Sequence, residues 1–103
     1  MLIATTENIA GRNYTTLGLV KGSVVQSKNC IRDFTAGLKS VIGGEIKGYT
    51  QMMNEARAIA TSRMVEEAES LGADAVVMVR FASSAVMQNS AEIICYGTAV
   101  KYI

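Results

Sequence analysis

Histidine and proline are both absent from this chain of 103 residues. Without histidine, the chain lacks the commonest general base and the commonest zinc ligand. The two cysteines, Cys30 and Cys95, lie far apart in the sequence and belong to no CxxC motif. We therefore expect no structural zinc site, and no disulfide in a reducing compartment.

Charged and aromatic residues are also scarce, at 18% and 6% of the chain, whereas 50% of the residues are hydrophobic. An average soluble domain carries about 25% charged residues, so the supply of apolar side chains is generous for one modest core. The ten basic and nine acidic residues leave a net charge of +1 and form no run of Lys or Arg. This pattern excludes the electrostatic footprint of a nucleic-acid-binding protein.

No hydrophobic segment is long enough to cross a membrane. The longest uninterrupted apolar run, Ala75–Val79, is far below the roughly 20 residues that a spanning helix needs. The first residues, MLIATTEN, contain neither the basic region nor the long apolar stretch of a signal peptide. The length corresponds to a single domain over residues 1–103, and we expect a cytoplasmic protein.

Hydrophobic periodicity predicts four strands and two helices. The strongest pattern is a helical period between residues 48 and 72, which indicates a long helix ended by Gly72. Its predicted buried stripe consists of Tyr49, Met53, Ala56, Ala60, Met64, Ala68 and Leu71. The other predicted elements are strands at 1–6, 14–27, 73–84 and 91–103, a shorter helix at 30–44 and a hairpin loop at 85–90. A change of apolar phase within the second strand predicts a bulge near Gly22.

The order of these elements, β–β–α–α–β–β, predicts an α+β domain of two layers. We expect a mostly antiparallel sheet with one long and one short helix on one side. The segments Ala75–Phe81 and Ile93–Val100 belong to strands that are apolar on both faces, which is typical of a sheet covered on both sides. Two helices cover only one face of such a sheet. We therefore expect the other face to pack against another subunit of a homo-oligomer.

Four segments together resemble one family, the YbjQ-like family of small bacterial and archaeal proteins. They are GGEIKGYT (43–50), the AR and RM pairs of the long helix (56–57 and 63–64), GADAVVMVR (72–80) and YGTAV (96–100). The resemblance covers nearly the whole chain. It implies a β-α-β-β-type subunit that assembles into a ring-shaped homopentamer. The family is described as heavy-metal-binding, and its function is uncharacterised.

The stretch IGGEIKGY, residues 42–49, has the glycine content of a phosphate-binding loop. Such a loop leads from a strand into a helix, whereas this stretch follows a predicted helix, and Lys47 is followed by Gly48 instead of Ser or Thr. We interpret the glycines as the end of one helix and Glu45 as a residue near the start of the next. The functional alternative is an anion or partner site that uses Lys47, Tyr49 and the helix N-terminus.

The cysteines are the candidate ligands for a metal. Cys95 alternates with Gly97 and Ala99 on one strand face, which favours a small core residue. Cys30 lies at a strand-to-helix junction, where its thiol is expected to be the more exposed. Two thiolates could bind a soft metal ion, so Cys30 and Cys95 are kept as candidate ligands, with no zinc motif beside them and any other cofactor unknown.

Arg80 is the least expected charge, because it ends an almost wholly apolar strand. The lengths of strand and helix place it near Glu55 and not far from Glu45, so we predict an ion pair with one of them, within the chain or across an interface. Arg80, Glu45 and Tyr96 could share one end of the fold as a ligand site. We favour a non-enzymatic ring that binds a small ligand or metal ion. The alternatives are an enzyme that uses these three residues at subunit interfaces, and a purely structural scaffold.

Overall fold

The computed structural model describes residues 1–27, 41–42, 45–87 and 90–103, without the side chains of 27, 41–42, 45–47, 49 and 86–87. Its elements are β1 (Leu2–Ile3), β2 (Tyr14–Ser27), β3 (Val41–Ile42), β4 (Glu45–Ile46), α2 (Lys47–Ser70), β5 (Ala75–Met87) and β6 (Ser90–Tyr102). Four strands form one sheet in the order β1-β5-β6-β2, in which only β1 and β5 are parallel neighbours. The predicted α+β class, the long helix and the mostly antiparallel sheet are confirmed.

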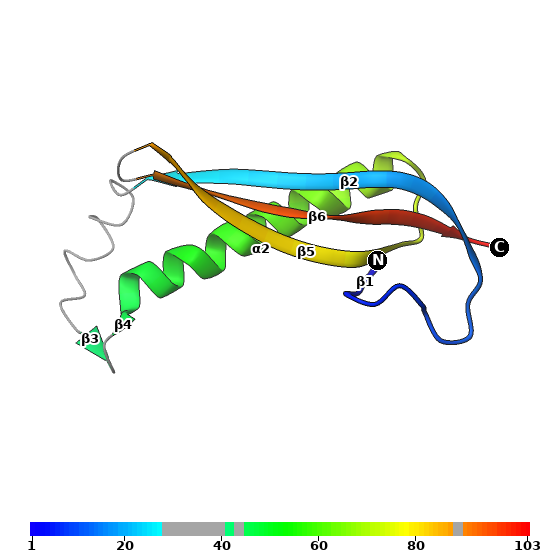
Figure 1. Cartoon of the computed structure of the whole chain (residues 1–103), viewed down its shortest axis with the longest axis horizontal. Helices are drawn as coiled ribbons and strands as arrows, with labels where there is room; N and C mark the ends of the chain where they lie inside the picture. Colours follow the sequence, from blue (N-terminus) through cyan, green and yellow to red (C-terminus); the bar gives the residue numbers. More distant parts are fainter. Residues whose placement is uncertain (28–40, 43–44, 88–89) are drawn as a thin grey trace.

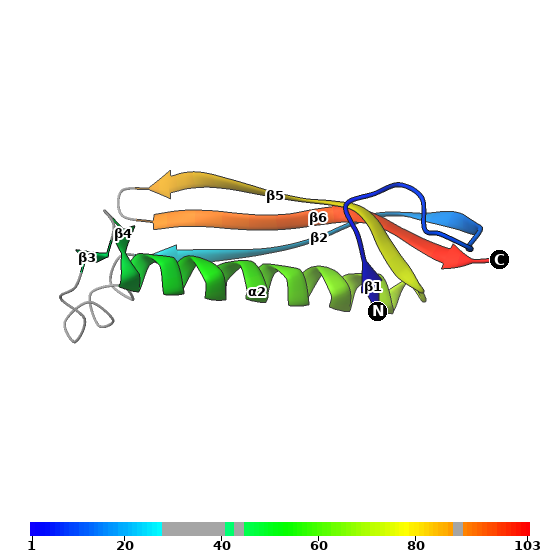
Figure 2. The ribbon, with the colours of Figure 1, turned by 90° about the horizontal axis from the view of Figure 1, so that it is seen from below.

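Helix α2 lies along one face of this sheet, as two views at right angles show (Figures 1 and 2). It packs mainly on β2 and β6 and only slightly on β5. The helix therefore covers one side of the sheet unevenly. The outer half of β5 keeps little helical cover, even on the side where α2 lies.

The buried side of α2 follows from its sequence. Its fully or almost fully buried residues recur every four positions, which is one face of a 3.6-residue helix. They are Met52, Ala56, Ala60, Met64 and Ala68. Gly72 ends the helix with a φ of 77°, and its N–H donates to Glu69 O at 3.0 Å, as predicted for a glycine at this position. Leu71 was predicted to be buried, but it is 49% exposed because the chain turns away from the sheet at Gly72.

Gly22 sits where α2 approaches β2 most closely. A Cβ atom at this position would collide with backbone atoms of Ala60 and Met64. The glycine is thus required by close packing of the helix on the strand, and the predicted bulge near Gly22 is wrong. The register runs unbroken past Gly22, and the irregularity in β2 falls between Thr16 and Gly18 instead.

A second small core lies on the opposite face of the sheet. Ala75, Val77 and Val100 are buried there, and the partly buried residues that pack against them are Ile9, Tyr14 and Tyr102. The segment before β2 is held over this end of the sheet by the Tyr14 hydroxyl, which donates to Glu7 O at 2.7 Å. The expectation that only another subunit could cover this face is therefore wrong at this end, where the chain covers itself.

The predicted short helix and the predicted hairpin loop both differ from the structure. Most of the predicted helix at 30–44 lies outside the described residues, but Val41–Ile42 form β3, which pairs antiparallel with Glu45–Ile46. The β-branched side chains at these positions favour extended backbone, so the helical prediction is wrong there. The predicted loop at 85–90 is also too long, because β5 continues to Met87 and β6 begins at Ser90.

Within the described residues, no helix has the length and apolar character needed to cross a bilayer.

Candidate functional site

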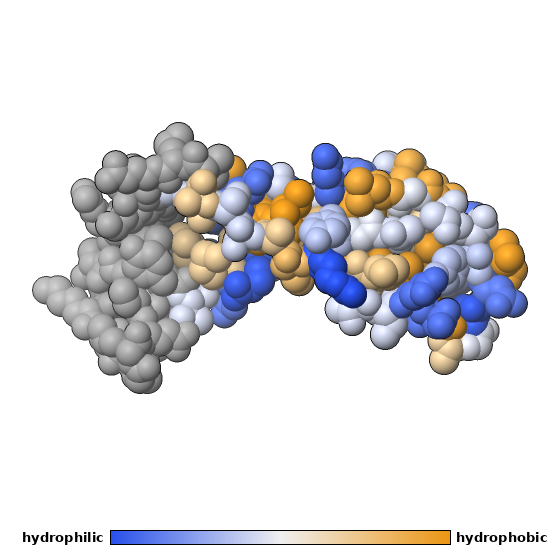
Figure 3. Space-filling model, viewed as in Figure 1, coloured by the Kyte–Doolittle hydropathy of each residue, from blue (hydrophilic) through white to orange (hydrophobic). Residues whose placement is uncertain are grey.

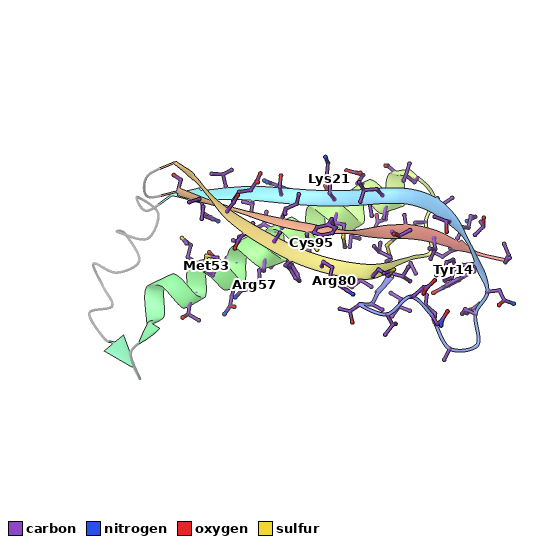
Figure 4. The ribbon with its side chains drawn as sticks, in the orientation of Figure 1. Tyr14, Lys21, Met53, Arg57, Arg80 and Cys95 are labelled. Atoms are coloured by element: carbon purple, nitrogen blue, oxygen red, sulfur yellow. The ribbon has the colours of Figure 1, made fainter. Side chains whose placement is uncertain are left out.

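The sheet face away from α2 carries a row of three polar side chains. Residues paired directly across antiparallel strands share a face, and Tyr96 of β6 pairs with both Lys21 of β2 and Arg80 of β5. Their neighbour Cys95 points to the other side and is buried under the helix. We call Lys21, Tyr96 and Arg80 the central row; the labelled Lys21 and Arg80 extend from either side of β6 in Figure 4.

Apolar side chains flank the central row on the same face. Leu19 and Val25 alternate with Lys21 along β2 and are 67% and 57% exposed, and Ile94 of β6 is half-buried. Figure 3 views this side of the sheet and shows a hydrophilic band between more hydrophobic areas. We call Leu19, Val25, Ile94 and the central row the open face. A large apolar surface with a polar strip is typical of a surface that binds another molecule.

Arg80 is held by backbone carbonyls. Its Nη1 donates to Thr5 O at 3.0 Å and to Val79 O at 2.9 Å. No carboxylate among the described side chains forms an ion pair with it, since the only such pair there is Lys101–Asp74 at 3.7 Å. The predicted pair with Glu55 of the same chain is wrong, because Arg80 and α2 lie on opposite faces of the sheet. The Glu45 side chain lies outside the described residues.

A bulge in β5 sets the direction of Arg80. The register between β5 and β6 shifts between Val77 and Arg80, and Met78 within the shift has a φ of 54°. The extra residue lets Val77 and Arg80 face the same side. Positive φ is uncommon for methionine and leaves no signal in the sequence. The prediction could therefore identify Arg80 as unusual, but not the face on which it lies.

The predicted metal ligand Cys95 is a core residue. Its thiol is fully buried between α2 and the sheet, 3.6 Å from Met64 Sδ, and it accepts a weak hydrogen bond from Thr61 Oγ1 at 3.8 Å. Burial raises the pKa of this thiol, although the Thr61 contact acts in the opposite direction. Among the described residues, no three Cys, Asp or Glu side chains come together as a metal site. Cys30 lies outside them.

A groove opens on the helix side, where α2 diverges from β5. It has a volume of about 140 Å³ and is lined by Met53, Arg57, Phe81, Ala82, Ser83 and Ile93. Phe81 pairs with Cys95 and so faces the helix side, yet it is 50% exposed because α2 packs only slightly on β5. Arg57 Nη2 donates to Asn54 Oδ1 at 2.6 Å. The groove could not be predicted from the sequence, because it depends on the angle between α2 and β5.

The structure brings together only some of the predicted site residues. Arg80 and Tyr96 are direct neighbours on adjacent strands. Glu45, Lys47 and Tyr49 belong to β4 and the first turn of α2, at the far end of the molecule from the middle of the sheet (Figure 1). The predicted residues therefore do not form one cluster. Lys21, which completes the central row, could have been found from the alternation of residues along β2.

The fold and the open face define a small α+β protein with a long helix on one side of a mixed four-stranded sheet. The chain belongs to the YbjQ family, whose model, described as "Putative heavy-metal-binding", matches residues 1–103. It is 59% identical to a UPF0145 protein of Clostridium novyi over 103 residues, with 100% of both chains covered. It is 56% identical to a UPF0145 protein of Methanosarcina acetivorans over 102 residues, which cover 98% of this chain and 96% of the other.

The fold is similar to that of a solved protein. A crystal structure of a protein of unknown function of the DUF74 family, from Pediococcus pentosaceus, superposes with a TM-score of 0.70. The match covers 100% of this chain and 98% of the other, at 16% sequence identity. At this identity the likeness establishes the shared fold alone.

Proposed function

We propose that the protein is a non-enzymatic, cytoplasmic homopentamer, a ring that binds a small ligand. The observation that carries the proposal is the open face, where Leu19 is 67% and Val25 57% exposed. Exposed apolar side chains gathered on one sheet face are typical of a surface that binds another molecule, and a second copy of the chain would remove them from water. The number five is what the family resemblance implies.

The unpaired strand edges support assembly as well. Within the described residues, β1 pairs with β5 only at Ala75 and Val76, so the outer edge of β5 beyond Arg80 has no strand beside it. Strand β2 is 14 residues long and forms the other edge of the sheet. Long free edges invite pairing with another chain. A ring also needs two different surfaces that meet, because five-fold closure uses a heterologous interface.

The binding of a heavy-metal ion has less support in the structure than the binding of a small organic ligand. The contact of 3.6 Å between Cys95 Sγ and Met64 Sδ would bring two soft donors together. However, both side chains are fully buried, and the raised pKa of the thiol favours the protonated form, whereas metals bind the thiolate. An enzymatic role rests on Arg80, whose Nη1 is already engaged with two backbone carbonyls. We therefore favour the binding of a small ligand over the binding of a heavy metal.

Light scattering coupled to size exclusion tests the assembly. At micromolar concentration, the expected mass is about five times the 11.0 kDa of one chain. The measurement is repeated at two salt concentrations, because an apolar interface is little affected by screening. A species with the mass of a single chain under all these conditions would contradict the ring.

A further inference from the structure

The groove between α2 and β5 has the composition of a ligand site. Ile93 forms its floor and is 3% exposed, while Met53 and Phe81 are only partly covered. Ligand sites are mostly apolar and contain a few polar groups that fix orientation. Here those groups are the Arg57 guanidinium and the Ser83 hydroxyl, which come from different elements on either side of the groove.

Arg57 is oriented without being neutralised. The Asn54 amide oxygen accepts from Nη2 at 2.6 Å, one helical turn away, and an amide carries no charge. No ion pair engages Arg57 among the described residues, and no acidic residue lines the groove. A guanidinium has five N–H donors in a fixed fork, so further donors remain for a carboxylate.

We propose that this groove binds a small monocarboxylate with an apolar body, such as a short aliphatic or aromatic acid. The carboxylate pairs with Arg57, and the body lies against Phe81 and Ile93. The groove volume of about 140 Å³ is close to that of an engineered apolar cavity of about 150 Å³ that binds benzene, so it suits a compact body. The proposal rests on the ligand-binding part of the proposed function and does not require the ring.

The test is a titration of the full-length protein with benzoate and hexanoate, followed by NMR of labelled Ile93 and Met53 methyl groups. Both acids should give saturable shifts at millimolar concentration, and benzamide, which has the same shape and no charge, should bind much more weakly. Arg57→Met should weaken benzoate binding about tenfold or more. Arg63→Met is the matched control, because Arg63 lies on the same helix and donates to Ser23 O of β2.

The outcomes separate this proposal from the ring. Absence of saturable shifts at Ile93 and Met53, or equal binding of benzamide and benzoate, would overturn the carboxylate site. Equal losses for Arg57→Met and Arg63→Met would overturn it too, since the effect would then be one of net charge. Light scattering of the same samples reports the assembly independently, so a pentamer that ignores carboxylates leaves the ring standing.

Discussion

The burial of Cys95 could be predicted from the sequence, but its chemical surroundings could not. Its alternation with Gly97 and Ala99 predicted a core position, and it is fully buried. The same residue was a candidate metal ligand, because sequence alone does not reveal the neighbours of a thiol. Its neighbours are the Met64 thioether and the Thr61 hydroxyl, with no charged group in contact. Desolvation therefore dominates, and it raises the pKa of the thiol.

The raised pKa predicts a loss of stability at alkaline pH. The folded state holds the Cys95 proton more tightly than the unfolded state, so its contribution is complete below the unfolded pKa of about 8.5 and is lost as pH rises through the folded pKa. In a Cys30→Ser background, the free energy of unfolding in urea should fall more steeply above about pH 8.5 with Cys95 than with Cys95→Ala. Parallel curves for the two proteins would contradict the buried thiol.

At the scale of elements, prediction succeeded where a pattern is long. Helix α2 repeats its buried positions every four residues from Met52 to Ala68, and β2 was predicted with the bounds that the structure has. The strand predicted at 1–6 is present as β1, but it is reduced to two residues, and β3 has only two residues, too few for any period to be visible. The irregularities in β5 and β2 were not predicted correctly, for another reason. The irregularity in β5 depends on the positive φ of Met78, and the one in β2 lies beside Gly18, which also has a positive φ. Such backbone geometry arises only in the folded sheet.

A glycine at position 22 is compatible with two local structures, and only one of them is present. A strand glycine marks either a bulge or a close approach of another backbone. The collision that a Cβ would make with Ala60 and Met64 identifies the second case. Helix-to-strand contact at this point depends on residues about forty positions apart, and no local pattern records it.

Gly22→Ala should therefore be strongly destabilising. The added methyl group meets backbone atoms of α2, which cannot rotate away as a side chain can, so α2 has to shift from the sheet. We expect a loss of about 2–3 kcal/mol in the free energy of unfolding, measured in urea. Ser23→Ala, at the adjacent exposed position, is the control and should change it by less than about 0.5 kcal/mol. Similar values for both variants would show that the helix is not packed tightly on Gly22.

At the scale of the whole molecule, the question is what covers the second face of the sheet. Because the strands are apolar on both faces, another subunit was expected to cover it. The structure divides that face into two parts. The end near Ala75 and Val100 is covered by the chain's own first residues, whereas Leu19 and Val25 remain exposed. The sequence pattern could not separate these parts, since it does not show the path of residues 1–13 across the sheet.

The exposed apolar side chains of the open face can be tested by replacing them with charged ones. Leu19→Lys combined with Val25→Lys places two charges where the proposed interface would bury apolar side chains. An unpaired buried ammonium is costly, so the ring should dissociate, with the dissociation constant raised about a hundredfold or more. Both positions are exposed in the isolated chain, so its far-UV circular dichroism should be unchanged. The control is Ile103→Lys, because Ile103 is 84% exposed and follows the end of β6. If the double variant has the same mass as the unmodified protein by light scattering, subunits do not meet through the open face, and the apolar residues there serve another contact.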